Sequence, residues 1–363
     1  MGVFSVILYI WKLRSNGSFD EVAVIDDASS VIWVERHTDT GEFEVYIRAS
    51  KERLELLADG DVFITRSESD IAMYVESVKL NTDEENGDYL TVSGRSAEVV
   101  LHWRIVQFAS FTGETATAEN IIRYLFTQQF LLPTDEAKYI PWLSLEETHE
   151  WEDGAAHQYT GKSLNQIFGS LCVEVGYGYR LKWIGTGFRF ELYKGTDRSY
   201  DQHVNPFVVF SPTFENLGNT EYEKNTSEYA NAAIVGGEGE GTARTFVEVA
   251  EQGKSGFYFR QVYLDARNSS KEDLTDEEYE EQLTNDGKAQ LEELKVTAEY
   301  SGEILNYNSY EYRKDYNLGD KVSIKNQYGI TGNATITQIT EVEDASGFRI
   351  VPTLSEWQPI SFN

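Results

Sequence analysis

Alternating apolar and polar residues dominate the first hundred positions and predict β-strands. The run "SSVIWVERHTDTGEFEVYIRA" holds two β-rich segments that are separated by "RHTDTGE", with Gly41 at the turn, which is typical of a hairpin. Further alternating runs follow, with an Asn86-Gly87 turn, and a short helix is expected at about residues 50–57. The apolar run "GVFSVILYIW" is about half as long as a membrane span and is interpreted as a strand.

Two helices are predicted beyond residue 106, where the pattern changes. The segment "TAENIIRYLFTQQFLL" carries apolar side chains on most faces, which indicates a buried helix. In "SLNQIFGSLCVEVGY", Ser163 and Gln166 form a capping box. The apolar positions of this second helix repeat with a helical period and are Leu164, Ile167, Phe168, Leu171 and Val175. The helix should pack against a sheet built from "GYRLKWIGTGFRFELY", whose two strands are joined by residues 185–187.

A long acidic helix is predicted between two further groups of strands. It opens with Thr275 and Glu278 as a capping box. Its narrow apolar stripe consists of Tyr279, Leu283, Leu291 and Leu294. Gly287 lies on the same stripe, where glycine costs about 1 kcal/mol relative to alanine, so we expect a close approach to another surface there. Four or five strands with glycine turns follow residue 297.

The order of these elements predicts a mainly β chain with α+β inserts. Its expected parts are a first small β-barrel at 1–105, an α+β insert at 106–204, a second β-barrel built from 205–240 and 297–357, a strand-helix insert at 241–296 and a C-terminal tail at 358–363. Two small barrels with excursions between them are the simplest architecture for this pattern.

Charge and cysteine content exclude several classes of function. The 61 acidic residues outnumber the 31 basic ones and give a net charge of −30, so the surface repels nucleic acid phosphates and does not grip them. Cys172 is the only cysteine, which rules out a disulfide or a thiolate metal site within one chain; we expect a small buried hydrophobe. No basic n-region precedes the apolar N-terminal run, so no secretion signal and no membrane insertion are predicted.

The strongest metal-site candidate is "HEWEDGAAH". It contains His149, Glu150, Glu152, Asp153 and His157, but a helical zinc pair needs histidines four residues apart, and Gly154 breaks a helix between these two. The segment is therefore interpreted as an acidic loop that leads into the strand "HQYTG", and no metal is predicted.

Other clusters carry equally weak chemical signals. "GGEGEGTAR", at residues 236–244, lacks the Lys-Ser/Thr pair of a phosphate-binding loop, and Glu238 and Glu240 would repel phosphates, so a turn is expected. A saccharide platform could be built from Trp142, Trp151 and Trp183 beside Glu146, Glu147 and Glu152, although tryptophan is also an ordinary core residue. The five histidines are scattered (His37, His102, His149, His157 and His203). We predict no enzymatic activity, no catalytic, cofactor-binding or metal-binding residue, and no cofactor.

The stretch "ELYKGTDRS" looks at first like the edge of an active site. It places Lys194, Gly195, Thr196, Asp197 and Arg198 in consecutive positions after an alternating apolar run. Such a run typically ends in a turn, and the adjacent Asp197 and Arg198 cannot bind one ligand as a fork. Each of these two side chains is expected to cap or pair locally.

Four segments together resemble the tail-tip, or baseplate, hub proteins of long-tailed bacteriophages, notably of the siphophage branch. They are "LYKGTDRS", "SPTFENLGNTEYEKNTSEYANAAIVGGEGEG", "LDARNSSKEDLTDEEYEEQL" and "YNLGDKVSIKNQYGITGNATITQITEVEDASGFRIVPTL". The resemblance implies two barrel-like domains that alternate around a trimeric ring and give a pseudo-sixfold annulus at the end of the tail tube. It further implies that the ring docks on the distal tail protein, encloses the tape-measure terminus and opens when DNA leaves.

The resemblance thus predicts a non-enzymatic homotrimeric hub of the virion that is assembled in the host cytoplasm. Receptor-binding or fibre proteins are further candidate partners, and DNA passes without being bound specifically. A carbohydrate-binding tail or surface module is the alternative, and a hydrolase with an acidic site is a third. Strand edges or side chains near "GEFEVYIRA" and "GNATITQITEV" are expected to close the ring. Many such hubs carry a long C-terminal extension, whereas "SEWQPISFN" alone follows the last strands of this sequence, so wall hydrolysis or receptor binding is expected from another chain or from a part outside this sequence.

Overall fold

A computed structural model of the protein describes residues 6–67, 69–82, 87–113, 116–154, 157–271, 274–305, 309–325, 328 and 331–359. Its helices are α1 (Lys51–Ala58), α2 (Ala118–Phe126), α3 (Leu164–Val175) and α4 (Asp276–Glu293). Its strands are β1 (Leu8–Leu13), β2 (Phe19–Ile25), β3 (Ser30–Arg36), β4 (Glu42–Arg48), β5 (Val62–Arg66), β6 (Ser69–Asn81), β7 (Tyr89–Ser96), β8 (Ile105–Phe111), β9 (Leu143–Leu145), β10 (His157–Ser163), β11 (Tyr177–Trp183), β12 (Phe188–Lys194), β13 (Val209–Phe210), β14 (Leu217–Asn225), β15 (Ala232–Gly236), β16 (Phe246–Ala250), β17 (Gln261–Asp265), β18 (Thr297–Ile304), β19 (Lys321–Lys325), β20 (Thr331–Asp344) and β21 (Gly347–Pro359).

The chain divides into two units, each with its own core. The first unit comprises Met1–Glu221 and Tyr300–Asn363, and the second comprises Tyr222–Glu299. The chain leaves the first unit within β14 and returns to it within β18.

The N-terminal strands form an antiparallel sheet in the order β2, β1, β5, β6, β7, β4, β3. Alternation along each strand turns one face inward, and side chains such as Leu8, Ile10 and Trp33 are completely buried there. The predicted β3–β4 hairpin is confirmed, and α1 begins after Ser50, whose side chain accepts from Arg53 N. Asn86 of the predicted turn lies outside the described residues.

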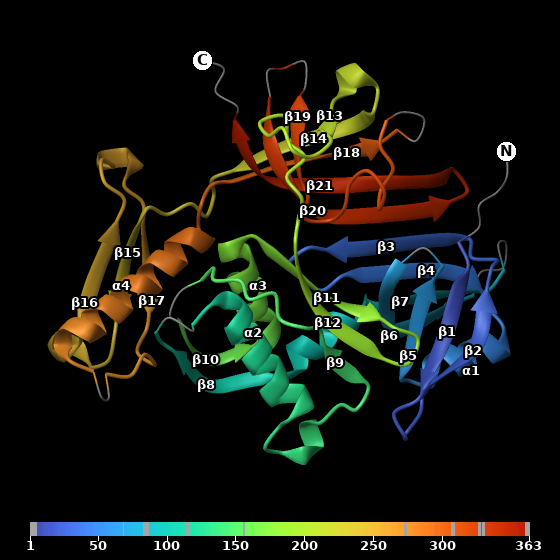
Figure 1. The fold of residues 1–363 in the computed structure, drawn as a ribbon, viewed down its shortest axis with the longest axis horizontal. Helices are drawn as coiled ribbons and strands as arrows, with labels where there is room; N and C mark the ends of the chain where they lie inside the picture. Colours follow the sequence, from blue (N-terminus) through green and yellow to red (C-terminus); the bar gives the residue numbers. More distant parts are fainter. Residues whose placement is uncertain are drawn as a thin grey trace. The chain divides into compact units, whose positions relative to one another are not determined.

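The first and last β segments of the chain share one sheet (Figure 1). β3 pairs with β4 on one side and with β20 on the other, from Val31↔Glu343 to Arg36↔Gln338. β20 in turn pairs with β21 and β19, so the C-terminal strands continue the N-terminal sheet. The mainly β class with α+β inserts is confirmed, whereas closure of either β region into a barrel stays a prediction.

The two segments that were expected to close a ring through strand edges have no free edge. β4, from "GEFEVYIRA", pairs with β3 and with β7. β20, from "GNATITQITEV", is flanked by β21 on one side and by β19 and then β3 on the other. The expectation of edge pairing there was wrong because each strand already has a neighbour on both sides.

Two helices pack on a second group of strands within the first unit. β12 pairs antiparallel with β11 and parallel with β9, and β11 reaches β6 at Lys182↔Ile71. The capping box of Ser163 and Gln166 is confirmed at the start of α3, and α2 continues into a π-helical turn at Thr127–Leu131. The core between helices and strands is aromatic and includes Phe126, Phe130, Phe168, Tyr179 and Phe190, all at most 1% exposed.

The second unit is a three-stranded sheet covered by α4. β15 is the central strand, antiparallel to β16 and parallel to β17. The capping box of Thr275 and Glu278 is confirmed, and Tyr279, Leu283 and Leu291 face the sheet. At Gly287 an added Cβ atom would lie 2.8 Å from Val235 Cγ2 and 2.9 Å from Val249 Cγ2. The expected close approach of α4 to another surface is confirmed, and that surface is the sheet.

Replacing Gly287 should loosen the second unit. Valine and glycine have similar helix propensities, so Gly287→Val tests packing, and overpacking should cost about 1–3 kcal/mol. The matched control Ala289→Val, at an exposed position of α4, should cost about 0.6 kcal/mol. Native-state hydrogen exchange of the β15 amides measures both, and equal protection in the two variants would contradict close packing at Gly287.

Candidate functional site at the junction of three segments

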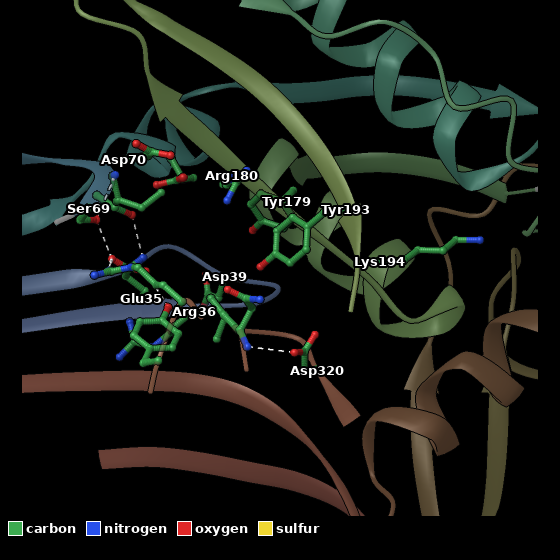
Figure 2. Close-up of a pocket in the computed structure, with 18 of the residues that line it drawn as sticks. Glu35, Arg36, Asp39, Ser69, Asp70, Tyr179, Arg180, Tyr193, Lys194 and Asp320 are labelled. Carbon is green, nitrogen blue, oxygen red and sulfur yellow. Dashed lines mark hydrogen bonds and ion pairs between the residues drawn. The ribbon is translucent and has the colours of Figure 1, made fainter. Parts of the chain in front are cut away.

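A polar cavity of about 600 Å³ lies where three parts of the first unit meet. Figure 2 shows Glu35 and Arg36 of β3 on one side and Tyr179, Arg180 and Tyr193 of β11 and β12 on the other. The segment before β19 supplies a third part of the wall, with Tyr312, Arg313, Asn317, Leu318 and Asp320. The cavity therefore depends on residues that are far apart in sequence.

Four charged side chains connect the N-terminal strands to the C-terminal ones; Glu35, Arg66 and Glu341 are buried, whereas Arg313 is partly exposed. Arg313 Nη2 lies 2.9 Å from Glu35 Oε1 and 3.1 Å from Glu341 Oε1. Arg66 forms an ion pair with Glu341 and lies 4.0 Å from Glu35. Burial disfavours the Glu35 carboxylate, but Arg313, Arg66 and hydrogen bonds from two hydroxyls outweigh it and hold the Glu35 pKa below its ordinary value. The four charges neutralise one another, so they serve as a link and offer no free carboxylate for catalysis.

Asp320 fixes the segment that follows β12. Its buried carboxylate accepts hydrogen bonds from Thr196 N at 2.7 Å, Arg198 Nε at 2.7 Å and Asn317 N at 2.9 Å. Gly195 has room for no side chain, because an added Cβ atom would lie 1.7 Å from Gly319 O. The predicted strand end at "ELYKGTDRS" is confirmed, since β12 stops at Lys194.

The two charged residues after that strand end behave differently. Asp197 accepts from Ser199 N at 2.9 Å, which is the local cap that was expected. Arg198 instead pairs with Asp320, 122 residues away, so its predicted local pairing was wrong. The tertiary fold brings in a stronger partner than any that the sequence places nearby.

Burial shifts the pKa of two titratable groups beside the cavity towards their neutral forms. Glu98 Oε1 accepts from Leu181 N, whereas Oε2 has no partner among the described residues, and burial raises the Glu98 pKa. Burial lowers the pKa of His37 to about 4, and its Nδ1 lies 3.1 Å from the Tyr193 hydroxyl.

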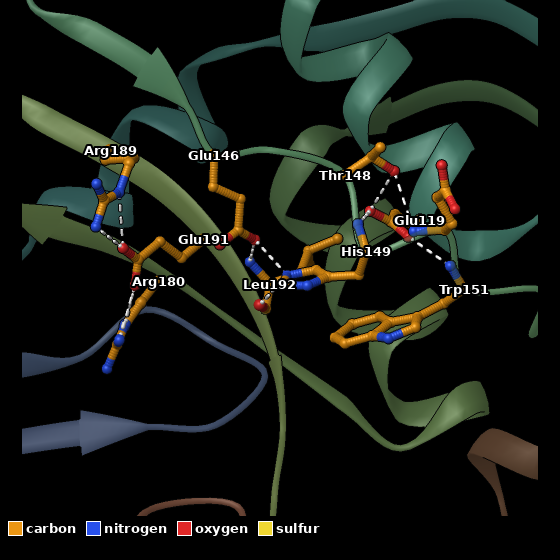
Figure 3. A network of polar contacts seen from close by, with 10 residues as sticks. Glu119, Glu146, Thr148, His149, Trp151, Arg180, Arg189, Glu191 and Leu192 are labelled. Carbon is orange, nitrogen blue, oxygen red and sulfur yellow. Dashed lines mark hydrogen bonds and ion pairs between the residues drawn. The ribbon is translucent and has the colours of Figure 1, made fainter.

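The "HEWEDGAAH" segment is organised by a residue that sequence analysis missed. Figure 3 shows Glu119 of α2 accepting from His149 N at 2.7 Å, Trp151 N at 2.8 Å and Thr148 Oγ1 at 2.9 Å. Its carboxylate is buried, yet these donors hold the Glu119 pKa below its ordinary value. The predicted loop leading into a strand is confirmed, because β10 begins at His157.

The proposed metal ligands of that segment do not converge. His149 Nε2 lies 3.1 Å from Glu146 Oε1, whereas His157 Nε2 lies 3.0 Å from Glu174 Oε2 on α3. Within the described ranges no group of three or more histidine, cysteine or carboxylate side chains could hold a metal ion. Glu150 and Glu152 belong to the same loop and add no shared ligand position.

The three tryptophans that could form a saccharide platform are separated. Trp142 and Trp183 pack edge-on against Phe19, with ring centroids 5.6 Å and 4.9 Å away, in the core beneath β12. Trp151 stacks on His149 at 4.3 Å, with Lys194 Nζ 4.5 Å from its ring. The carboxylates at Glu146 and Glu147 therefore do not face a common aromatic surface.

The remaining sequence candidates have structural roles. Cys172 is completely buried on α3, as predicted, and burial raises its pKa. The glycine-rich run is the predicted turn: β15 ends at Gly236, and Glu238 N donates to the Tyr279 hydroxyl at 2.6 Å. In the part of the chain that is described, no helix is long and apolar enough to cross a membrane.

A comparison with family profiles decides the relationship of the chain. Residues 7–354 match the Siphovirus ReqiPepy6 Gp37-like protein family. The chain belongs to this family. The predicted relationship to proteins of long-tailed bacteriophages is thereby confirmed. A search of curated proteins found no match.

Solved structures with a similar fold include tail proteins. A tail protein from Neisseria meningitidis MC58 is similar with a TM-score of 0.58 at 12% identity, covering 98% of this chain and 99% of the other. A 43 kDa tail protein of prophage MuSo2 from Shewanella oneidensis gives 0.56 at 12% identity, covering 96% and 98%. One chain of a lidless PdpA–VgrG complex gives 0.50 at 9% identity, covering 99% and 66%. The family member thus has a tail-protein fold along nearly its whole length.

Removing one carboxylate of the buried ion cluster should destabilise the first unit strongly. Glu341→Gln leaves the buried Arg66 without its close carboxylate partner, which should cost about 3–5 kcal/mol. The control Glu42→Gln removes a half-exposed pair with Arg36 and should cost at most about 1 kcal/mol. Urea unfolding followed by tryptophan fluorescence reports this unit, which holds all seven tryptophans, and similar losses in both variants would refute the role of the cluster.

Glu98 should make stability depend on pH in a defined direction. Because its folded pKa is raised, the folded state binds more protons, so stability falls as pH rises above the unfolded value of about 4.3 until the folded pKa is passed. Glu98→Gln keeps an acceptor for Leu181 N without this titration, so it should match the wild type near pH 4 and exceed it by on the order of 1 kcal/mol at pH 8. Urea midpoints across this range test the sign, with exposed Glu55→Gln as the control, and parallel profiles for Glu98→Gln and wild type would disprove it.

Proposed function

We propose that this chain is the structural hub of a siphophage tail tip, in which three copies close a ring that continues or ends the tail tube. The ring docks on the distal tail protein, surrounds the terminus of the tape-measure protein and lets DNA pass during ejection. Assembly takes place in the host cytoplasm before the hub becomes part of the virion. The chain acts by shape and assembly and not by catalysis.

One observation carries this proposal: the chain shares its fold with phage tail proteins from end to end. The two tail proteins named above are covered to 99% and 98% of their own lengths, and the family match spans residues 7–354. Similarity over a whole chain favours a shared architectural role more than similarity in one module would. The internal construction agrees, since the ion pairs of the junction bind distant segments of the chain together.

The charge of the chain suits a conduit for DNA. Each copy carries a net charge of −30. A wall that shares this acidity repels phosphates and lets DNA slide, whereas a basic wall would release counterions from DNA and bind it. DNA is accordingly a passing cargo of the ring and not a ligand.

Ring formation should respond to salt in a characteristic way. Three copies of −30 repel one another, and the screening length shrinks from about 30 Å at 0.01 M salt to about 10 Å at 0.1 M. We therefore expect the purified chain to shift towards three times the chain mass in light scattering as salt and concentration rise. Trimers that dissociate on adding salt would contradict a ring limited by charge repulsion.

Electron microscopy is the second test of ring formation. Tails assembled with a tagged copy should show the label as an annulus at the tube end. A chain that is monomeric at every salt concentration but forms this annulus closes its ring only on a tail partner. A label along the tail shaft, or on no tail at all, would overturn the hub assignment.

A further inference from the structure

An open groove of about 700 Å³ lies between β8 and α2. All of β8, Ile105–Phe111, forms one wall, and Asn120, Tyr124 and Gln128 belong to the other. Three large side chains of the groove are strongly exposed: Ile105 to 55%, Phe108 to 60% and Tyr124 to 55%. The groove combines apolar side chains with side-chain amides and the backbone of a strand.

The backbone of β8 has an unused edge. β8 pairs with β10, and among the described residues it pairs with no other strand. Leu164 N donates to Arg104 O at 2.9 Å, so the backbone of Arg104 points towards the β10 side. Hydrogen-bonding direction alternates along a strand, and therefore Ile105, Gln107 and Ala109 direct their N–H and C=O groups away from β10.

The sequence of this edge lacks the usual protection against pairing. Exposed edge strands are normally blocked by charged residues, proline or bulges. "IVQFASF" contains no charged residue and no proline, although 25% of the chain is charged, and the pairs that it forms with β10 on either side of Gln107 share one register. An uncharged, β-prone edge in such an acidic protein indicates that a strand covers it in the working assembly.

The charges beside the groove indicate which kind of strand would bind there. Lys138 lines the groove, and Arg104 directly precedes β8 and donates to Lys138 O at 3.4 Å. Neither cation forms a salt bridge within the described ranges, although the chain has about twice as many acidic as basic residues. Arg104 Nε and Gln129 Oε1 are also buried without a hydrogen-bond partner in the same part of the structure. Carboxylates on an incoming segment would complement the cations, and its backbone would satisfy the free edge.

We propose that this groove binds an extended segment of another protein, with apolar residues at alternate positions and carboxylates between them, which adds a strand to β8. Main-chain hydrogen bonds would supply affinity, and the exposed Ile105, Phe108 and Tyr124 would hold the apolar side chains. The inference rests on the proposed function only in taking that segment from another tail protein. Binding of the segment does not require the ring, so the two can fail separately.

Fluorescence anisotropy with a labelled peptide of alternating valine and glutamate, as long as β8, tests the groove on the full chain. A peptide of the same composition with its valines grouped, and one of alternating valine and lysine, are the probe controls. The alternating acidic peptide should bind, and added salt should weaken it; the two control peptides should bind at least about tenfold more weakly. Equal binding of the grouped peptide would overturn strand addition.

Two substitutions at one position separate the backbone from the side chain. Gln107→Pro removes an outward N–H without touching the ladder to β10 and should weaken binding about tenfold, whereas Gln107→Ala should stay within about twofold. Lys138→Glu should weaken binding of the acidic peptide and reduce its salt dependence. Unchanged tryptophan fluorescence and melting confirm that each variant folds, and unaltered binding by folded Gln107→Pro would refute the proposal.

The oligomeric state distinguishes the two sources of a covering strand. If a second copy of this chain covers β8, the acidic peptide should not bind and Gln107→Pro should abolish self-association in light scattering, which would overturn the proposal of a different partner. If the proposal holds, Gln107→Pro self-associates like the wild type and loses only the peptide. A chain that forms no ring but binds the peptide as described supports the groove while the hub assignment fails.

Discussion

The pairing of β3 with β20 is the constraint on which the first unit depends, because it brings the buried charges of Glu35, Arg66 and Glu341 together beside the partly exposed Arg313. Glu35 and Arg66 come from the N-terminal strands, and Arg313 and Glu341 from the C-terminal part of the chain. A buried ion cluster adds less stability than well-packed apolar side chains would, but losing one member is costly. Such a cluster therefore specifies which segments pair and in which register, since any shift leaves a charge without its partner.

The turn that follows β12 is also held in place by a buried charge with several partners. Asp320 collects three donors, two of them from the Thr196–Arg198 turn, and Gly195 lets that turn approach the backbone of Gly319. The cavity beside these links is lined by ion-paired groups such as Glu35 and Arg313 and by Glu98, whose pKa burial raises. The groups around the cavity join segments of the chain to one another, which suits a protein that must hold its shape in an assembly.

The charges on the surface of the protein differ in role from those at this junction. Acidic residues cover much of the chain and keep copies and DNA apart, so attachment to a partner needs places where charge is absent. The β8 edge is such a place: the strand is uncharged, and Arg104 and Lys138 beside it form no salt bridge within the described residues. An acidic protein can thus remain soluble and still present one directional surface, because a strand edge recognises only an extended backbone.

Local patterns in the sequence determined most of the elements. The capping boxes at Ser163 and Thr275 fixed the starts of α3 and α4, the helical period of their apolar residues fixed the buried faces, and Gly287 already indicated a close contact. These features depend on neighbours within one or two helical turns, so they can be read without the fold. The family resemblance likewise rests on short continuous segments of the sequence.

Only the tertiary structure decided which distant segments meet. The partners of Arg66, Arg198 and Glu119 lie 29 to 275 residues away, and no spacing rule connects them. A weak local signal existed, since Glu35, Arg66 and Glu341 each follow a buried apolar residue by two positions on a strand and so fall on its inner face. That pattern indicates a charged side chain that needs a partner, but it does not identify the partner, because strand pairing between the ends of the chain is set by the packing of the whole sheet. For the same reason, the strands that were expected at free edges lie in the interior of the sheet.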